Sequence, residues 1–190
     1  MARFMKITAA VISIIAFFLT VSFFMLDFSF LLSATITFWT FAYHLLMRLA
    51  VGWIIDQIMH NHANCYHNWF KLKKFEISLY RFLKIRKWKG KMPTYSPELF
   101  DASKHSYIEI AQAMCQAEIV HECIIVLSFL PLILAVFFGE FWIFLLTSLS
   151  AAMFDSLFVM MQRFNRPRIL KISEHKNINH HNSMDEKLQN

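Results

Sequence analysis

A short run of ionisable residues, Glu118-Ile119-Val120-His121-Glu122, stands at the start of an apolar stretch and has the residue types needed for acid–base chemistry. Glu118 lies three residues before His121 and four before Glu122, so either pair would share a helix face. A carboxylate beside an imidazole raises its basicity and fixes its tautomer, as a general base acting on a hydroxyl requires. The alternative is a polar turn at the membrane interface, where Glu also favours the helix dipole.

A second group, Gln162-Arg163-Phe164-Asn165-Arg166-Pro167-Arg168, is strongly basic. Pro167 disfavours the helical conformation at Arg166, so we expect a helix to end there. Arginines around a rigid turn can bind phosphate or carboxylate in bidentate fashion. Anchoring of a membrane helix by positive charge is the simpler alternative. Asp155, about two turns earlier, is expected to point toward these arginines.

Nine histidines invite a metal hypothesis, in which a membrane di-iron oxygenase would use them as ligands. Two groups of three are present, at His60, His62 and His67 and at His175, His180 and His181. The spacing is not that of a standard histidine box, and such a site would need nearly every histidine of the chain. We therefore predict no metal and no bound cofactor.

The elements that must position these residues are four apolar runs of about twenty residues, at 7–26, 28–51, 119–138 and 141–161. Each can cross about 30 Å of hydrocarbon as a helix, the form in which backbone groups bond one another. Tight connections lie around Asp27 and at Gly139–Glu140. The predicted fold class is therefore all-α: a polytopic membrane protein of four transmembrane helices in two hairpins, forming a single domain over 1–190. The first run is expected to be a retained helix and not a cleaved signal.

Positive charge is segregated into the N-terminus, a central segment at about 59–117 and the C-terminal region, while the two tight turns contain no Lys or Arg. This pattern predicts a multi-pass protein of the cell membrane with both termini in the cytoplasm. The net charge of +6 is explained by these flanks, so we do not expect a nucleic-acid partner. Arg48 lies near the cytoplasmic end of its run, where snorkelling would explain it.

The central segment interleaves aromatic residues with lysines, as in amphipathic segments that lie among anionic headgroups. We expect a break between Met92 and Pro97, and then a helix that runs from near Tyr107 into the third span. The second helix should continue amphipathically as far as Ile58. The tail at 173–190 is predicted to be flexible. The three cysteines have no metal-like spacing and are interpreted as reduced packing residues: Cys65, Cys115 and Cys123.

Three segments resemble the glycosyl-4,4'-diaponeurosporenoate acyltransferase family, which acylates the sugar of staphyloxanthin-type carotenoids. They are Ile85-Arg86-Lys87-Trp88-Lys89 with Pro93 nearby, Ala117-Glu118-x-x-His121, and the run Gln162–Arg168. The resemblance covers about residues 75–172, and its most specific element is the third segment. The chain departs from the family pattern in having Ala113, Gln116, Glu122 and Asp155 where Glu, Arg, Trp and Asn are expected.

The resemblance implies a membrane acyltransferase that moves a fatty acyl group from acyl-CoA or acyl carrier protein to a hydroxyl or amine of a lipid, glycolipid or other amphipathic acceptor. His121 would act as the base, oriented by Glu118 or Glu122, and the inner faces of the spans would hold the acyl chain. Trp88 would seat the central segment at the interface. The predicted donor-binding residues are Arg86, Lys87, Lys89, Arg163, Asn165, Arg166 and Arg168.

Other functions remain open from the sequence. The chain could be a non-catalytic accessory or immunity subunit that works with a partner subunit, a membrane methyltransferase, or the di-iron oxygenase considered above. Membrane lipids are expected partners in every case. Iron analysis and thioester consumption would separate these classes.

Overall fold

A computed structural model describes the backbone of residues 2–26 and 28–188 and the side chains of 3–26, 28–176 and 178. Asp27, predicted to form the first tight turn, lies outside the described residues. The described chain is helical and contains no strand, which confirms the all-α class. Four of its helices are long and apolar enough to cross a membrane: Arg3–Leu26, Ser29–Met59, Tyr107–Phe138 and Phe141–Lys176.

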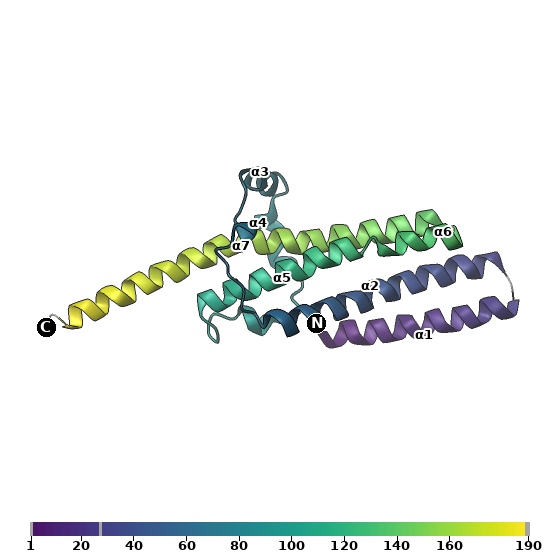
Figure 1. Ribbon diagram of the computed structural model, residues 1–190, viewed down its shortest axis with the longest axis horizontal. Helices are drawn as coiled ribbons and strands as arrows, with labels where there is room; N and C mark the ends of the chain where they lie inside the picture. The colour runs from purple at the N-terminus through teal and green to yellow at the C-terminus, as the bar shows by residue number, and fades with distance from the viewer. Residues whose placement is uncertain (1, 27, 189–190) are drawn as a thin grey trace. The chain divides into compact units, whose positions relative to one another are not determined.

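The elements follow one another along the chain as Figure 1 labels them. The helices are α1 (Ala2–Leu26), α2 (Ser29–Met59), α3 (Lys74–Phe82), α4 (Ile85–Trp88), α5 (Tyr107–Leu127), α6 (Ala135–Phe138) and α7 (Phe141–Leu188). Short 3₁₀ turns are η1 (Asn68–Phe70), η2 (Lys89–Lys91), η3 (Pro97–Phe100) and η4 (Leu130–Leu134). The break before Pro97, the start of α5 at Tyr107 and the continuation of α2 past Ile58 are as the sequence predicts.

The chain divides into two compact units, which are described separately. Unit 1 contains Met1–Ile58 and Val120–Phe158, and unit 2 contains Met59–Ile119 and Val159–Asn190. Helices α5 and α7 contribute residues to both units. The expectation of a single domain over the whole chain stays a prediction.

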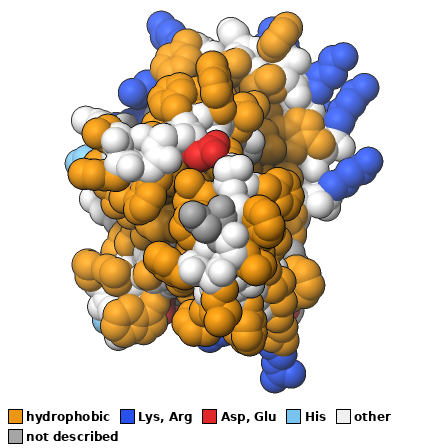
Figure 2. Space-filling view, turned by 90° about the vertical axis from the view of Figure 1, so that its right-hand side faces the viewer, with side chains coloured by type: hydrophobic (Ala, Val, Ile, Leu, Met, Phe, Trp, Pro, Cys, Tyr) orange, Lys and Arg blue, Asp and Glu red, His pale blue; other side chains and the backbone are white. Residues whose placement is uncertain are grey.

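Unit 1 packs its helices through small residues and a few long-range hydrogen bonds. Ala9 and Ala16 of α1 are 1% and 0% exposed, whereas the large hydrophobic side chains of α1 are mostly exposed. Lipid is as apolar as a leucine side chain, so close approach at small residues is what associates such helices. Trp39 Nε1 donates to Thr20 Oγ1 at 3.0 Å, and this bond joins α2 to α1. Hydrophobic side chains dominate the face in Figure 2.

A proline explains the interruption of the third span. Pro131 has no N–H to donate to the carbonyl of Leu127, so α5 ends there and η4 follows. Tyr43 of α2 supplies the missing donor, since its hydroxyl lies 2.8 Å from that carbonyl oxygen. The third predicted span is thus confirmed as a segment that can cross a membrane, with its C-terminal part formed by η4 and the short helix α6.

Pro167, unlike Pro131, does not interrupt its helix. The predicted helix end at Arg166 is wrong, because α7 continues through Pro167 to Leu188. Arg163 and Arg166, which precede the proline, are both buried and bonded to other parts of unit 2. These contacts hold the helix in place on the N-terminal side of Pro167. The backbone of 173–188, expected to be flexible, belongs to the same helix.

Candidate active site

Asp155 on α7 is the buried centre of a polar cluster in unit 1. Its Oδ1 lies 2.8 Å from Nδ1 of His121 on α5, and its Oδ2 accepts a hydrogen bond from Nη2 of Arg48 on α2. The Asp155 side chain is 1% exposed, against 15% for Arg48 and 21% for His121. Three helices of unit 1 thus bring together an imidazole, a carboxylate and a guanidinium.

The position of Arg48 corrects two expectations from the sequence. A charge inside a span costs about 2.5–3.5 kcal/mol on insertion scales, and snorkelling was expected to relieve it. The Arg48 guanidinium instead stays in unit 1, where it bonds Asp155 and the carbonyls of His44 and Ala151 at 3.1 and 3.4 Å. Asp155, expected to face the arginines of the run Gln162–Arg168, instead forms an ion pair with Arg48.

His121 has the geometry of an oriented base. With Asp155 accepting at Nδ1, the neutral imidazole carries its proton on Nδ1 and leaves a lone pair on Nε2. Phe158 of α7 stacks on the ring, with centroids 4.6 Å apart and planes 8° from parallel. The ring is therefore held on one edge and one face, and its partial exposure leaves it accessible to a substrate.

Three further polar side chains of unit 1, those of Thr35, His44 and Ser148, are buried without a hydrogen-bond partner among the described residues. Both ring nitrogens of His44 are unpaired, and so is Oγ of Ser148. Their exposed fractions are 4% and 0%. His44 lies one helical turn before Arg48, so unused hydrogen-bonding capacity is present beside the Asp155 cluster. Sequence reasoning missed His44, although its i,i+4 spacing to Arg48 inside an apolar helix was a usable signal.

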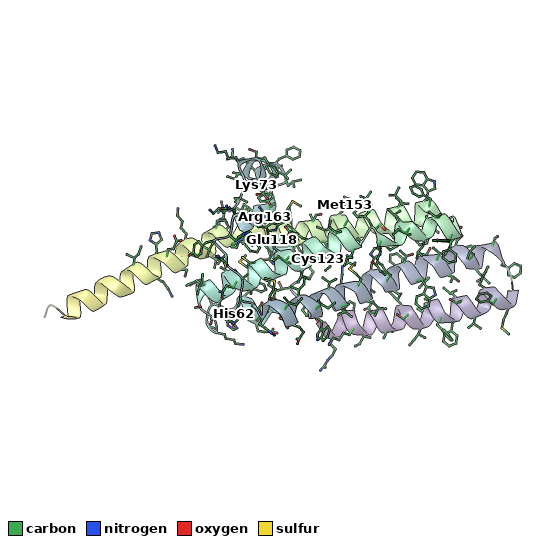
Figure 3. All side chains as sticks on the ribbon, viewed as in Figure 1. His62, Lys73, Glu118, Cys123, Met153 and Arg163 are labelled. Carbon is green, nitrogen blue, oxygen red and sulfur yellow. The ribbon has the colours of Figure 1, made fainter. Side chains whose placement is uncertain are left out.

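Glu118 belongs to a different cluster, in unit 2. Its Oε1 lies 2.5 Å from Nη1 of Arg163, and Figure 3 labels both residues. Its Oε2 accepts a hydrogen bond from Nη1 of Arg166. Arg166 also donates to the carbonyl of Phe70 and stacks on the ring of that residue, 4.9 Å from the centroid. Both carboxylate oxygens of Glu118 are thus bonded to arginines, while the carboxylate that contacts His121 is that of Asp155.

Arg163 is fully occupied by protein groups. Nε and Nη2 donate to the Glu76 carboxylate at 2.6 and 3.1 Å, and Nη1 donates to Glu118. The two other N–H groups donate to the carbonyls of Trp69 and Lys71, each at 3.1 Å. A guanidinium has five N–H donors, so none is left for a substrate phosphate. Arg163 therefore ties the start of the central segment to α5 and α7.

The pKa of Glu76 shows the result of this pairing. Burial opposes ionisation of the carboxyl, but hydrogen bonds from Arg163 and from the backbone N–H of Lys73 outweigh it. The pKa of Glu76 is consequently lowered below its usual value. The carboxylate is also part of a capping arrangement at the N-terminus of α3, where it accepts from Lys73 N at 2.6 Å.

A group of cations in unit 2 is arranged around Phe164. Lys89 Nζ and the Arg168 guanidinium lie 5.1 and 4.5 Å from the ring centroid, and Lys89 also donates to Asn165 Oδ1. Burial lowers the pKa of Lys89, and repulsion from Arg168 and Arg86 adds to the effect. No carboxylate partner of Lys89, Arg86 or Arg168 is present among the described side chains. This group can therefore bind an anion.

Three other predicted site residues are Lys87, Trp88 and Glu122. Lys87 is exposed beside Arg86 on α4, and Trp88 Nε1 donates to the carbonyl of Leu83 at 3.0 Å. Glu122 is half-buried on α5. Among the described side chains, no three His, Cys, Asp or Glu residues converge as metal ligands would. The side chains of His180 and His181 lie outside the described residues.

Comparison with known proteins bears on what these clusters do. The model of one protein family, described as glycosyl-4,4'-diaponeurosporenoate acyltransferase, matches residues 66–175. The chain belongs to this family. No curated protein and no solved structure matches the chain. The resemblance found in the sequence is confirmed, and with it the assignment of the protein as an acyltransferase enzyme.

The family match covers most of the residues of both clusters. Residues 66–175 of this acyltransferase include His121 and Asp155 in unit 1 and the Glu118–Arg163–Arg166 group in unit 2. Arg48 and His44 precede the matched region. Asp155, which stands where the family pattern has Asn, is thus the central residue of the cluster in unit 1.

Proposed function

We propose that this acyltransferase moves a fatty acyl group from a thioester donor to a hydroxyl of an amphipathic lipid acceptor, with His121 as general base. The observation that carries the proposal is the bond between His121 Nδ1 and Asp155 Oδ1, because it leaves Nε2 free to accept a proton. The family activity supplies the reaction class, and its name indicates a glycosylated carotenoid acid as one candidate acceptor.

In this mechanism Nε2 of His121 takes the proton of the acceptor hydroxyl as its oxygen attacks the thioester carbonyl. Asp155 stabilises the imidazolium that forms, and Arg48 holds the Asp155 side chain in place through its ion pair with Oδ2. Collapse of the tetrahedral intermediate forms the ester and breaks the carbon–sulfur bond. The imidazolium then returns the proton to the leaving thiolate, so the enzyme ends in its starting state.

For the donor we propose the cations around Phe164 as the phosphate site. Acyl-CoA and the prosthetic group of acyl carrier protein both carry phosphate, and the cations of this group have no carboxylate partner among the described residues. Arg168 and Arg86 would bind phosphate through their planar forks and Lys89 as a point charge. Lys87 is exposed on the same short helix and adds positive charge.

We further propose that both termini and the central segment face the cytoplasm, where thioester donors are made. The Lys and Arg distribution supports this orientation. Helix α3 exposes Phe75 and Phe82 by 65% and 81% next to its basic residues, as expected of a helix seated among headgroups. Impermeant labelling of a cysteine placed at Lys91 or at Glu140 tests this: only the second should react from outside intact cells.

The test of function uses purified protein in lipid nanodiscs with radiolabelled palmitoyl-CoA and glycosyl-4,4'-diaponeurosporenoate as acceptor. His121→Ala should lower kcat about 10²–10⁴-fold, since this is what a general base contributes. Binding of palmitoyl-CoA should be unchanged, because the proposed phosphate site lies on other residues. His62→Ala is the matched control, an exposed histidine outside both clusters. Turnover of His121→Ala within a few-fold of wild type would refute the assignment of the base.

A further inference from the structure

Unit 1 contains an apolar cavity that the polar clusters do not use. Its volume is about 650 Å³, within the usual range for a site that holds one small ligand. Its walls come from α1, α2, η4, α6 and the start of α7, all of them in unit 1. No charged side chain lines it.

The few polar groups of the wall are nearly all satisfied. Thr20 donates to Ala16 O, Thr40 to Ile36 O and Tyr43 to Leu127 O, at 2.7 to 2.8 Å. Only the Thr35 hydroxyl lacks a partner among the described lining residues. A ligand with several polar or charged atoms would find almost nothing to bond there and would lose its hydration, so the cavity suits a hydrocarbon chain.

The cavity is long enough for most of such a chain, and its Tyr43 end is the end nearer to Arg48 along α2. Leu32 and Tyr43 both line it and lie eleven residues apart on α2, or roughly 16 Å at 1.5 Å per residue. An extended chain advances about 1.3 Å per carbon, given carbon–carbon bonds of about 1.5 Å, so roughly twelve carbons fit. Five more residues along α2, about 7 Å, lead from Tyr43 to Arg48, the partner of Asp155.

We propose that this cavity binds the fatty acyl chain that the enzyme transfers, with the carbonyl carbon toward His121 and the methyl end toward Leu32. The inference rests on the proposed function and deepens it, because it assigns a determinant of acyl-chain length. Together the two distances accommodate about 16 to 18 carbons, so saturated chains of that length are the preferred substrates. The wall at Thr35, about 20 Å along α2 from Arg48, lies where the last carbons would pass.

A size change at the wall tests the chain-length assignment. Thr35→Phe puts an aromatic ring into the cavity, whereas Thr37→Phe makes the same change at a half-buried position that does not line it. With an equimolar mixture of acyl-CoAs from ten to eighteen carbons, Thr35→Phe should shift the products by two or more carbons toward shorter chains, and Thr37→Phe should keep the wild-type profile. Leu134→Phe, on the opposite wall and 45% exposed, gives a second obstruction if Thr35→Phe does not fold. An unchanged product profile in the obstructed variants would overturn the inference.

A binding measurement separates this inference from the proposed chemistry. Trp39 lines the cavity, so a palmitic acid brominated near the middle of its chain should quench tryptophan fluorescence saturably in the His121→Ala protein. Unlabelled palmitic acid should reverse the quenching, and Trp39→Phe should remove the saturable part. Saturable quenching without any turnover in the wild type would support the binding site and reject the acyltransfer mechanism. Turnover without saturable quenching would show that the cavity is not the acyl-chain site. The same conclusion would follow if a carotenoid displaced the probe and palmitic acid did not.

Discussion

Replacing Asp155 by Asn separates catalysis from stability in the polar cluster of unit 1. The substitution keeps the shape of the side chain but removes the charge that holds both His121 and Arg48. Breaking one partner of a buried ion pair costs about 3–5 kcal/mol. Arg48 is 15% exposed and can regain some hydration, so we expect a loss near 3 kcal/mol.

The catalytic effect should be larger than this loss of stability implies. An Asn amide can donate its N–H to Nδ1 of His121, which places the imidazole proton on Nε2. Nε2 then has no lone pair with which to take the proton of the substrate hydroxyl. The same substitution beside the histidine of serine proteases lowers kcat about 10⁴-fold, so a loss of about 10³–10⁴-fold is expected for this enzyme. The KM for palmitoyl-CoA should change little.

The assay pairs steady-state acyl transfer with thermal unfolding in the same nanodiscs. The double variant Arg48→Met with Asp155→Asn removes the unpaired cation, so it should recover most of the melting temperature but none of the activity. Asp101→Asn, at the surface of unit 2, is the control for a change of Asp to Asn outside the cluster. If the double variant recovers activity together with stability, Asp155 acts only as a structural counter-ion and the reasoning is wrong.

Three further outcomes are expected. Tyr43→Phe should destabilise unit 1 by about 1–2 kcal/mol, because the Leu127 carbonyl loses its hydrogen-bond donor. Unfolding in mixed micelles measures this loss, and Tyr66→Phe, at an exposed site, should cause none. The pKa of Glu76 is lowered in the folded state, so the ionised carboxylate stabilises the fold fully above the unfolded pKa near 4.5. This stabilisation is lost as the pH falls through the folded pKa. The melting temperature should therefore fall less steeply from pH 7 to 3 in Glu76→Gln than in wild type. Arg168→Lys should raise the KM for palmitoyl-CoA several-fold at constant kcat, since a point charge replaces a planar fork, and full tolerance of Lys would leave membrane anchoring as the better account.

Hydropathy and charge determined the class of this protein without any tertiary information. Four runs near bilayer length predict four helices, because backbone groups in lipid can be satisfied only within the helix itself. The sequence also predicted the extension of α2 through Ile58 and the start of α5 at Tyr107. The first depends on the local amphipathic pattern and the second on the turn residues around Pro97. His121, singled out from the sequence as a candidate base, does lie in a polar cluster, and its catalytic role stays a prediction.

The partners of these residues depended on tertiary structure. Glu118 and Glu122 are the sequence neighbours that a helical pattern assigns to His121, but its bond is to Asp155, 34 residues away, and Asp155 in turn bonds Arg48 at a separation of 107. Helical spacing fixes which side chains share a face and says nothing about which other helix packs on it. The surroundings of the two prolines depended on tertiary structure in the same way. Pro167 stays in a helix beside arginines bonded to distant groups, and the carbonyl freed by Pro131 is satisfied by Tyr43, 84 residues earlier in the chain.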